Sequence, residues 1–522
     1  MPSKKYTIIA VILIVVLAIF FRFWQFSSIP AGLYQDEAMN GSDALTSLKT
    51  GEFQTFYPNN NGREGMIIWL DALAIKLFGT MPWVLRLFPA IAGVLAVLGL
   101  YFLTKELFSV EIALASGFFM ATSFWAVNFS RMGFRAGLMV PILIWSFYFL
   151  LRGFNQKYRF RKSIFFFILG GILFGLGFYT YISFRFAPVL ALLAFGPFLF
   201  RKNYKQFRIG VLAFVAAAFL AALPIGLYFL HNPTDFVGRS SEVSIFSQSS
   251  PVKALIVSAT KAFGMFNAAG DFNWRHNYAG SPELFWPVGI LFILGIGLSI
   301  KRFAFEEKFI FLWLIIFLLP NILTSEGNPH ALRAIGAMPV AMIFSGIGLV
   351  WLYRKAQKYF DDKIKNPVTQ NIERILRLKK EVFLLMTAFL LFIAAYNFSE
   401  YFNMWSFNPN TLSAFSHDQV EISQYLNSLP PQTEKYVLWH PDDRPTDNGL
   451  PVSAQTIYFL TVEKTKITYL KSNELDKIVL GQSGAVIAPN YFNLDLLHSL
   501  NKRFPNSYIK FIYQNTAVLV IQ

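Results

Sequence analysis

Two adjacent carboxylates, Asp36 and Glu37, follow the first apolar stretch of the chain in the segment A-G-L-Y-Q-D-E-A-M-N-G. A carboxylate held close to a hydroxyl group can accept its proton as a general base. Neighbouring acids also commonly begin a helix, where they complement the helix dipole and cap free backbone N–H groups. The pair therefore predicts either acid–base chemistry or a helix cap, and the spacing alone does not separate the two.

Arginine and histidine side chains recur beside later apolar stretches, together with one further acid. Arginine binds phosphate through two parallel hydrogen bonds, so several arginines on the same side of a membrane as two acids favour an anionic ligand. A phosphate carried on a lipid is the natural candidate. The alternative is that each arginine only extends its charged end towards lipid headgroups. The candidates for binding this substrate are Arg63, Glu64, Arg131, Arg135, Arg185, His276, His330 and Arg333.

Two of these candidates, His276 and His330, could also be metal ligands. They lie far apart in the sequence, and the chain contains neither H-x-x-H nor H-E-x-x-H. It has no cysteine, which excludes thiolate metal sites, disulfides and cysteine nucleophiles. The residues alone therefore predict no metal site and no certain cofactor, and a divalent metal stays open.

The composition predicts a polytopic α-helical membrane protein. Of the 522 residues, 55% are apolar and 15% are charged, whereas soluble proteins carry about 25% charged residues. Several apolar runs approach the roughly 20 residues that span a bilayer. The formal net charge is +16, but Lys and Arg cluster in short loops between the apolar runs, as is typical of cytoplasmic loops. This distribution favours a topology signal over nucleic-acid binding.

The first apolar run is preceded by Lys4 and Lys5, which place the N-terminus in the cytoplasm. A cleaved signal peptide is the alternative, but bulky residues stand at 21–26, where a small-residue cleavage site would be. The basic loops alternate along the chain, so the C-terminus is expected on the outer side. About eleven spans are expected, at 6–26, 82–104, 110–127, 137–151, 163–178, 186–200, 209–230, 284–300, 309–323, 335–353 and 382–397.

Two domains are expected. Residues 1–398 form the transmembrane domain, with long external loops at 27–81 and 231–283; an amphipathic pattern at 63–78 predicts a helix on the membrane surface. Residues 399–522 form a small outer α/β domain, because short apolar runs alternate there with helical patterns. Its expected strands are 435–440, 466–470, 484–489 and 508–513, and its expected helices are 453–460, 473–480 and 493–504.

The chain resembles the GT-C class of integral-membrane glycosyltransferases, particularly the bacterial branch similar to protein O-mannosyltransferases and to the aminoarabinose transferases of lipid A. The resemblance covers roughly residues 7–397. It rests on D-E-A in the first external loop and on G-R-E-G-M-I-I-W-L-D-A-L-A-I-K-L-F-G, followed by Leu85 and Arg86. It also rests on S-R-M-G-F-R-A and on L-P-N-I-L-T-S-E-G-N-P-H-A-L-R before a late span.

The resemblance implies a multi-pass enzyme of the cell membrane that moves a sugar from a polyprenyl-phosphate donor to a glycan, lipid or protein acceptor. It implies that Asp36 is the catalytic acid of the first loop, with Glu37 beside it. Arg63 and Glu64 occupy the region where the lipid A enzymes read E-K-P-P, and this chain reads R-E there. The difference argues against a lipid A acceptor and against carrying over any metal of those relatives.

Direct displacement by an acceptor hydroxyl would invert the anomeric centre, with Asp36 taking the proton and arginines stabilising the departing phosphate. Two other functions share the many spans and the cationic residues. One is a transporter or flippase of lipid-linked sugars, which often shows inverted repeats that are not visible here. The other is a ligase that joins whole glycan polymers. Membrane lipids are expected partners in every case.

Overall fold

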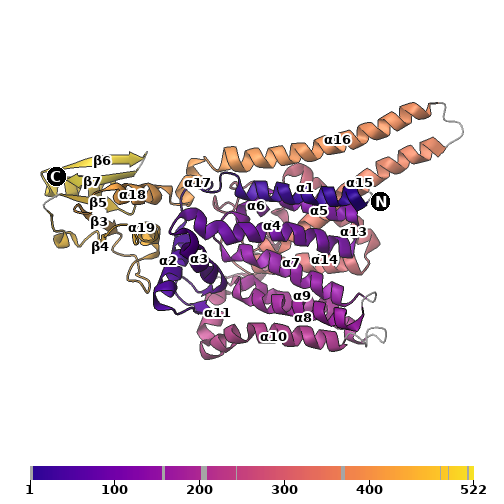
Figure 1. The fold of residues 1–522 in the computed structure, drawn as a ribbon, viewed down its shortest axis with the longest axis horizontal. Coiled ribbons are helices and arrows are strands. Elements are labelled where there is room, and N and C mark those ends of the chain that lie inside the picture. Colours follow the sequence, from indigo (N-terminus) through magenta and orange to yellow (C-terminus); the bar gives the residue numbers. More distant parts are fainter. Residues whose placement is uncertain are drawn as a thin grey trace. The chain divides into compact units, whose positions relative to one another are not determined.

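The computed structural model describes residues 4–155, 159–200, 208–242, 244–365, 371–481, 484–491, 493–513 and 516–522. It is mainly helical, with one sizeable sheet near the C-terminus (Figure 1). Contacts divide the chain into two compact units. The helical unit comprises Met1–Trp24 and Pro89–Trp405, and the mixed unit comprises Gln25–Phe88 and Ser406–Gln522. Helix α4, Pro82–Leu107, begins in the mixed unit and continues into the helical unit.

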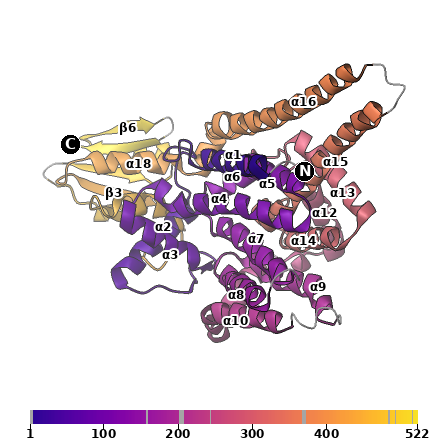
Figure 2. The same cartoon turned by 45° about the vertical axis from the view of Figure 1, so that its right-hand side comes forward.

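The helical unit is a bundle of long apolar helices joined by short loops. Beyond the other helices of this unit extend α16 and the end of α15 (Figure 2). Its helices are α1 Lys4–Phe23, α5 Val110–Thr122, α6 Phe124–Ser130, α7 Arg135–Gly153, α8 Phe160–Leu176, α9 Ala187–Phe200, α10 Arg208–His231, α11 Pro233–Glu242, α12 Pro251–Gly264, α13 Trp286–Arg302, α14 Phe305–Ile322, α15 Met338–Lys365 and α16 Ile372–Ser399. Short 3-10 turns include η2, Ile182–Phe186, and η5, Ile335–Ala337.

Within the described residues, eight helices are long and apolar enough to cross a membrane, and a ninth span results if α5 and α6, bent by 59°, count as one. Eleven spans were expected. The other two expected spans correspond to α13, which has only 17 residues, and α14, whose first turn carries Glu306, Glu307 and Lys308. The predicted membrane fold is confirmed, with eight or nine helices meeting the length and apolarity of a span.

Glycines allow helices of the bundle to approach closely. A side chain at Gly295 of α13 would collide with the carbonyl oxygen of Phe344 in α15, and one at Gly348 would collide with the carbonyl oxygen of Leu291. Small residues are the usual solution where helices pack without a hydrophobic driving force, because backbones can then meet directly.

The mixed unit contains a five-stranded sheet in the order β4-β3-β5-β7-β6, and a two-stranded hairpin, β1 with β2. Strand β3 pairs in parallel with β4 and β5, whereas β7 is antiparallel to β5 and β6. Its strands are β1 Phe56–Tyr57, β2 Arg63–Glu64, β3 Glu434–Trp439, β4 Thr468–Lys471, β5 Ala485–Pro489, β6 Ser507–Tyr513 and β7 Thr516–Ile521. Its helices are α2 Gln35–Thr50, α3 Met66–Phe78, α17 Pro409–Ala414, α18 His417–Ser428, α19 Gln455–Thr461 and α20 Leu494–Arg503.

The sheet is covered on both faces, as a mainly parallel sheet requires. Leu497 and Leu500 of α20 join the apolar cluster on one face. Ile422 and Leu426 of α18, with Ile457 of α19, join the cluster on the other. The predicted small α/β region at the C-terminus is thereby confirmed.

The first loop packs onto this C-terminal sheet region. Thr456 Oγ1 donates a hydrogen bond to the carbonyl oxygen of Leu33 at 3.0 Å. Lys49 and Glu463 form an ion pair at 2.7 Å. Residues 27–81 and 399–522 are therefore largely parts of one compact unit, and the domain division at 398/399 stays a prediction.

Candidate functional site

The first turn of α2 carries both candidate catalytic acids. Asp36 is half-buried, and its Oδ1 accepts a hydrogen bond from Asn60 Nδ2 at 2.9 Å. Glu37 is buried, and its Oε2 accepts a hydrogen bond from the backbone N–H of Tyr34 at 3.1 Å, the reciprocal bond of a capping box. The helix-cap alternative therefore describes Glu37, whereas Asp36 keeps a partly accessible carboxylate.

Glu37 also forms a buried ion pair with Arg86 of α4. Arg86 Nε lies 2.9 Å from Glu37 Oε1, and Arg86 Nη2 lies 3.0 Å from Glu37 Oε2. The same guanidinium donates to the carbonyl oxygens of Pro30 at 2.6 Å and Gly32 at 2.8 Å. Arg86 is 2% exposed and Glu37 is 0% exposed, so the pair holds the loop before α2 from the inside. A catalytic role for Glu37 stays a prediction that this geometry does not favour.

Arg63 and Glu64 form the short strand β2 and are both buried. The Arg63 guanidinium donates to Asn40 Oδ1 at 2.8 Å, and also to the Asp43 carboxylate and the side-chain oxygen of Asn59. These bonds tie the hairpin to α2. They give Arg63 a structural role, and phosphate binding by Arg63 and Glu64 stays a prediction.

Asp71 is a buried acid that was not among the predicted site residues. It lies on the inner face of α3 and is 1% exposed. Within the part of the chain that the structure describes, neither carboxylate oxygen has a hydrogen-bond partner. Burial, and then the negative charge of Glu37, raise the pKa of Asp71 well above its usual value. The available signal was an acid falling among the apolar positions of an amphipathic helix.

We expect Asp71→Asn to raise the free energy of unfolding of the mixed unit at neutral pH. An acid whose pKa is raised on folding binds more protons in the folded state, so stability falls as pH rises above the unfolded pKa of about 3.9. Asparagine does not titrate, so the gain in unfolding temperature should grow as pH rises from about 4 to about 8. Thermal unfolding followed by tryptophan fluorescence measures this gap, and a gap that is independent of pH would contradict the expectation.

In the helical unit, the candidate Arg131 is fully buried directly after α6. Its Nη1 donates to the carbonyl oxygens of Phe21 at 3.2 Å and Arg22 at 2.7 Å, and its Nη2 donates to that of Trp24 at 2.8 Å. The last carbonyl groups of a helix have no partner within the helix, so Arg131 caps the end of α1. Phosphate binding by Arg131 stays a prediction that we do not carry forward.

Three other candidates meet at one cavity of about 410 Å³ in the helical unit. Arg185, His330 and Arg333 line it. It lies among η2, α11, the end of α14 and the segment before η5, and Figure 1 shows α11 at the end of this unit opposite the N-terminus. The rest of the wall is mainly apolar and includes Ile182, Phe186, Phe236, Phe246, Leu323 and Leu332.

Both arginines are held in place at the cavity wall. Arg185 Nη1 donates to the carbonyl oxygen of Phe236 at 2.6 Å, and its guanidinium stacks 4.1 Å from the centre of the Phe236 ring. Arg333 Nη1 donates to Thr324 Oγ1 at 2.9 Å and to the carbonyl oxygen of Glu326. Arg333 is 9% exposed, and its Nη2 lies 3.8 Å from the largely exposed Glu326 carboxylate. Two positive groups are thus fixed beside apolar surface.

Further polar groups lie at the same cavity. Ser183 lines it and is 1% exposed, and its hydroxyl has no hydrogen-bond partner among the described residues. Arg135, at the start of α7, lies with its guanidinium 5.6 Å from the ring centre of Tyr181, which also lines the cavity. A ligand in the cavity would therefore meet hydroxyl groups as well as cations.

His330 connects this cavity to a buried cluster with Asp271 and His276. Asp271 is 2% exposed and His276 is 3% exposed. Asp271 Oδ2 lies 2.8 Å from His276 Nδ1 and 3.7 Å from His330 Nδ1, and the two imidazole rings are 4.8 Å apart between centres. The sequence identified both histidines as candidates, and the structure adds the carboxylate between them.

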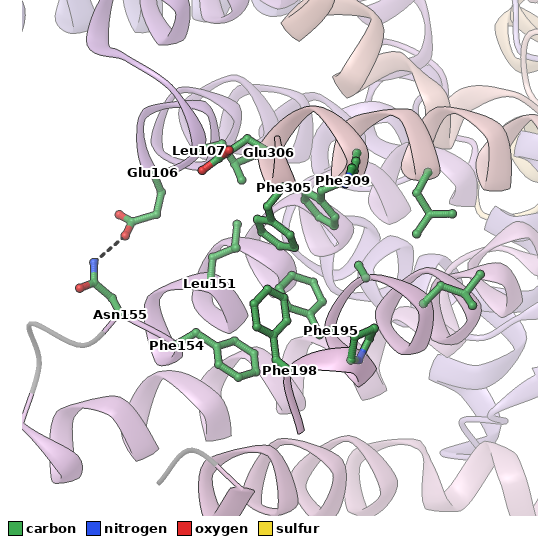
Figure 3. A pocket seen from close by; sticks show the side chains of 15 residues that line it. Glu106, Leu107, Leu151, Phe154, Asn155, Phe195, Phe198, Phe305, Glu306 and Phe309 are labelled. Carbon is green, nitrogen blue, oxygen red and sulfur yellow. Dashed lines mark hydrogen bonds between the residues drawn. The ribbon is translucent and has the colours of Figure 1, made fainter. Parts of the chain in front are cut away.

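A larger cavity of about 700 Å³ lies among α4, α7, α9 and α14 (Figure 3). Phe154, Phe195 and Phe305 form much of its wall, and its polar edge carries Glu106 and Glu306. Glu106 accepts hydrogen bonds from Asn155 and Arg152 outside the wall of aromatic rings. Two acids on its edge suit an anionic ligand poorly, so the smaller cavity with two arginines is the better phosphate site.

Residues 65–228 match the family model described as dolichyl-phosphate-mannose-protein mannosyltransferase. A comparison with curated proteins found no match. Among solved structures, ArnT from Cupriavidus metallidurans bound to undecaprenyl phosphate is 12% identical, with a TM-score of 0.59 over 99% of this chain and 98% of that chain.

Two other solved structures are similar. The oligosaccharyltransferase AglB from Archaeoglobus fulgidus, in complex with an inhibitory peptide and a dolichol-phosphate, is 13% identical, with a TM-score of 0.50 over 99% of this chain and 74% of that chain. The arabinofuranosyltransferase AftD from Mycobacteria is 12% identical, with a TM-score of 0.50 over 100% of this chain and 40% of that chain. The predicted resemblance and fold class are confirmed: the chain has the fold of the GT-C class of integral-membrane glycosyltransferases.

Proposed function

We propose that this protein is a glycosyltransferase that moves a sugar from a polyprenyl-phosphate donor to an acceptor on the outer side of the membrane. The fold and the family match over residues 65–228 support this class of reaction. The observation that carries the proposal is the cavity in which two fixed arginines lie beside apolar surface. A lipid phosphate has the same two parts, an anionic head and an apolar chain.

The arginines of this cavity supply the electrostatic part of the reaction. Negative charge develops on the phosphate as its bond to the anomeric carbon breaks, and fixed cations in a poorly hydrated site stabilise that charge. Arg185 and Arg333 are held by backbone and hydroxyl oxygens, so little reorganisation is needed when a phosphate binds. Ser183 offers a hydroxyl donor from the same wall.

Asp36 supplies the acid–base part of the proposed reaction. The acceptor hydroxyl transfers its proton to the Asp36 carboxylate while its oxygen forms a bond to the anomeric carbon. The bond from that carbon to the phosphate oxygen breaks, and its electron pair leaves with the polyprenyl phosphate. A single displacement of this kind inverts the anomeric centre. The proposal covers hexosyl and pentosyl donors alike, with the N-terminus in the cytoplasm and the residues after α16 on the outer side.

A transfer assay with defined donors tests the proposal. Purified protein in liposomes is supplied with radiolabelled polyprenyl-phosphate sugars and with candidate acceptors, and label in the acceptor is counted. Transfer that needs both donor and protein is expected. Movement of the labelled lipid between leaflets without any transfer would instead identify a flippase and overturn the proposal.

We expect Arg185→Ala and Arg333→Ala each to weaken donor binding by about 10- to 100-fold. A hydrogen bond to a charged group contributes about 1.5–3 kcal/mol, and each 1.4 kcal/mol is about tenfold in affinity. Lysine at either position should restore only part of the affinity, because it keeps the charge and loses the planar fork. Binding of undecaprenyl phosphate measured by calorimetry gives these dissociation constants.

The matched control is Arg302→Ala, which removes an arginine of the same unit whose side chain is 62% exposed. Its donor affinity should equal that of the unchanged protein. Unchanged affinity in both cavity variants would remove the phosphate from this cavity, while leaving the general-base role of Asp36 to be judged by its own variant.

A further inference from the structure

Asp271, His276 and His330 bring three potential metal ligands together from two separate segments. One ligand atom from each residue can be chosen so that all three lie within 4.8 Å of one another. Asp271 and His276 are almost completely buried, and the side chain of His330 is 17% exposed. Within the described residues, no other group of three histidine or acidic side chains has this geometry.

The donor set matches one class of metal ion. Two imidazole nitrogens and one carboxylate oxygen are ligands of zinc and its neighbours, whereas magnesium and calcium prefer oxygen alone. Ligand atoms about 2.0–2.2 Å from a tetrahedral ion lie about 3.4 Å from each other. The separation of 3.7 Å between Asp271 and His330 is close to this value, and the separation of 2.8 Å between Asp271 and His276 needs to open slightly.

The carboxylate is fixed by its own surroundings, as the ligands of metal sites usually are. Asp271 Oδ1 accepts a hydrogen bond from the backbone N–H of Asn273 at 2.8 Å, and Oδ2 accepts one from that of Ala331 at 2.8 Å. The backbone N–H of Asp271 donates to Glu283 Oε1 at 2.9 Å. The bond from Ala331 also joins the two segments that carry the histidines, so the three ligands are held as one group.

We propose that Asp271, His276 and His330 bind one divalent transition-metal ion of the zinc class. Three protein ligands leave a fourth position open on a tetrahedral ion. Because His330 also lines the cavity with Arg185 and Arg333, that position takes a phosphate oxygen of the donor. Metal binding stands on the cluster alone, whereas the contact with phosphate rests on the proposed function. Each histidine binds through a nitrogen without a proton, so the proton between Asp271 and His276 moves to the other imidazole nitrogen or leaves.

Metal content without substrate tests the first part. The protein is purified with a tag that contains no histidine, and metals are measured by mass spectrometry before and after addition of Zn²⁺ or Co²⁺ and desalting. About one ion per chain is expected in the unchanged protein. His276→Ala and His330→Ala should bind Co²⁺ at least about tenfold more weakly. His231→Ala, which removes an exposed histidine of the same unit, should not differ from the unchanged protein.

X-ray absorption of the zinc-loaded, unchanged protein keeps the test independent of the variants. Scattering from imidazole, with nitrogen and oxygen neighbours at about 2.0–2.2 Å, is expected. An ion content near zero, or retention equal in all three histidine variants, would overturn the site. Undecaprenyl phosphate should also change the visible spectrum of the Co²⁺-loaded protein. An unchanged spectrum would overturn the phosphate contact alone, and sugar transfer by metal-free protein would leave the proposed function intact.

Discussion

Asp36→Asn is expected to lower the rate of sugar transfer about 10²- to 10⁴-fold, the usual contribution of a general base. The amide cannot accept the proton, but it fills the same space. Its oxygen can still accept the hydrogen bond that Asn60 Nδ2 makes to Asp36 Oδ1 at 2.9 Å. The loss should therefore fall on kcat, with the KM for donor and the unfolding temperature close to those of the unchanged protein. Steady-state kinetics with a defined polyprenyl-phosphate sugar separates the two constants.

Asp442→Asn is the matched control for this variant. It removes the same charge from the same unit, from a side chain that is 89% exposed. Its kinetics should not change. A transfer rate that survives Asp36→Asn would exclude the general-base role, and a large rise in KM with unchanged kcat would make Asp36 a binding residue instead.

Local sequence patterns predicted most of the elements, because each depends on nearby residues. The run at 435–440 predicted β3, Glu434–Trp439, to within one residue at each end. Strand β7, Thr516–Ile521, was missed although its run T-A-V-L-V-I is as apolar as the others. Helix α18, His417–Ser428, was missed because its buried residues are scattered among polar ones. The helix expected at 473–480 is only a 3-10 turn at Leu475–Lys477.

The roles of individual arginines were less accessible to sequence. Arg131 and Arg185 both stand at the end of an apolar run, and nothing local distinguishes them. Arg131 is bound by the carbonyl groups at the end of α1, about 110 positions earlier in the chain. Arg185 instead lies at a cavity wall whose other residues come from α11 and α14. Which partner an arginine meets is decided by how distant helices pack, and one sequence without its fold does not contain that information in readable form.

Glu37→Gln is expected to lower the free energy of unfolding of the mixed unit by about 3–5 kcal/mol, because it leaves the Arg86 charge buried without a counter-charge. Both carboxylate oxygens of Glu37 bond Arg86, and neither side chain is more than 2% exposed. Thermal or denaturant unfolding followed by tryptophan fluorescence measures the loss. Transfer activity should fall together with the folded fraction, which distinguishes Glu37 from Asp36, whose replacement leaves the fold intact.

The double variant Glu37→Gln/Arg86→Met separates the ion pair from the general cost of substitution. It removes both charges, so its loss should be smaller than the sum of the two single losses. The pair Lys49 and Glu463 is the control, because its side chains are 59% and 45% exposed and such pairs contribute about 0–1 kcal/mol. Additive losses at Glu37 and Arg86 would show that the two charges do not stabilise each other. The loop that carries Asp36 would then owe its position to the carbonyl bonds of Arg86 and to the packing of α2.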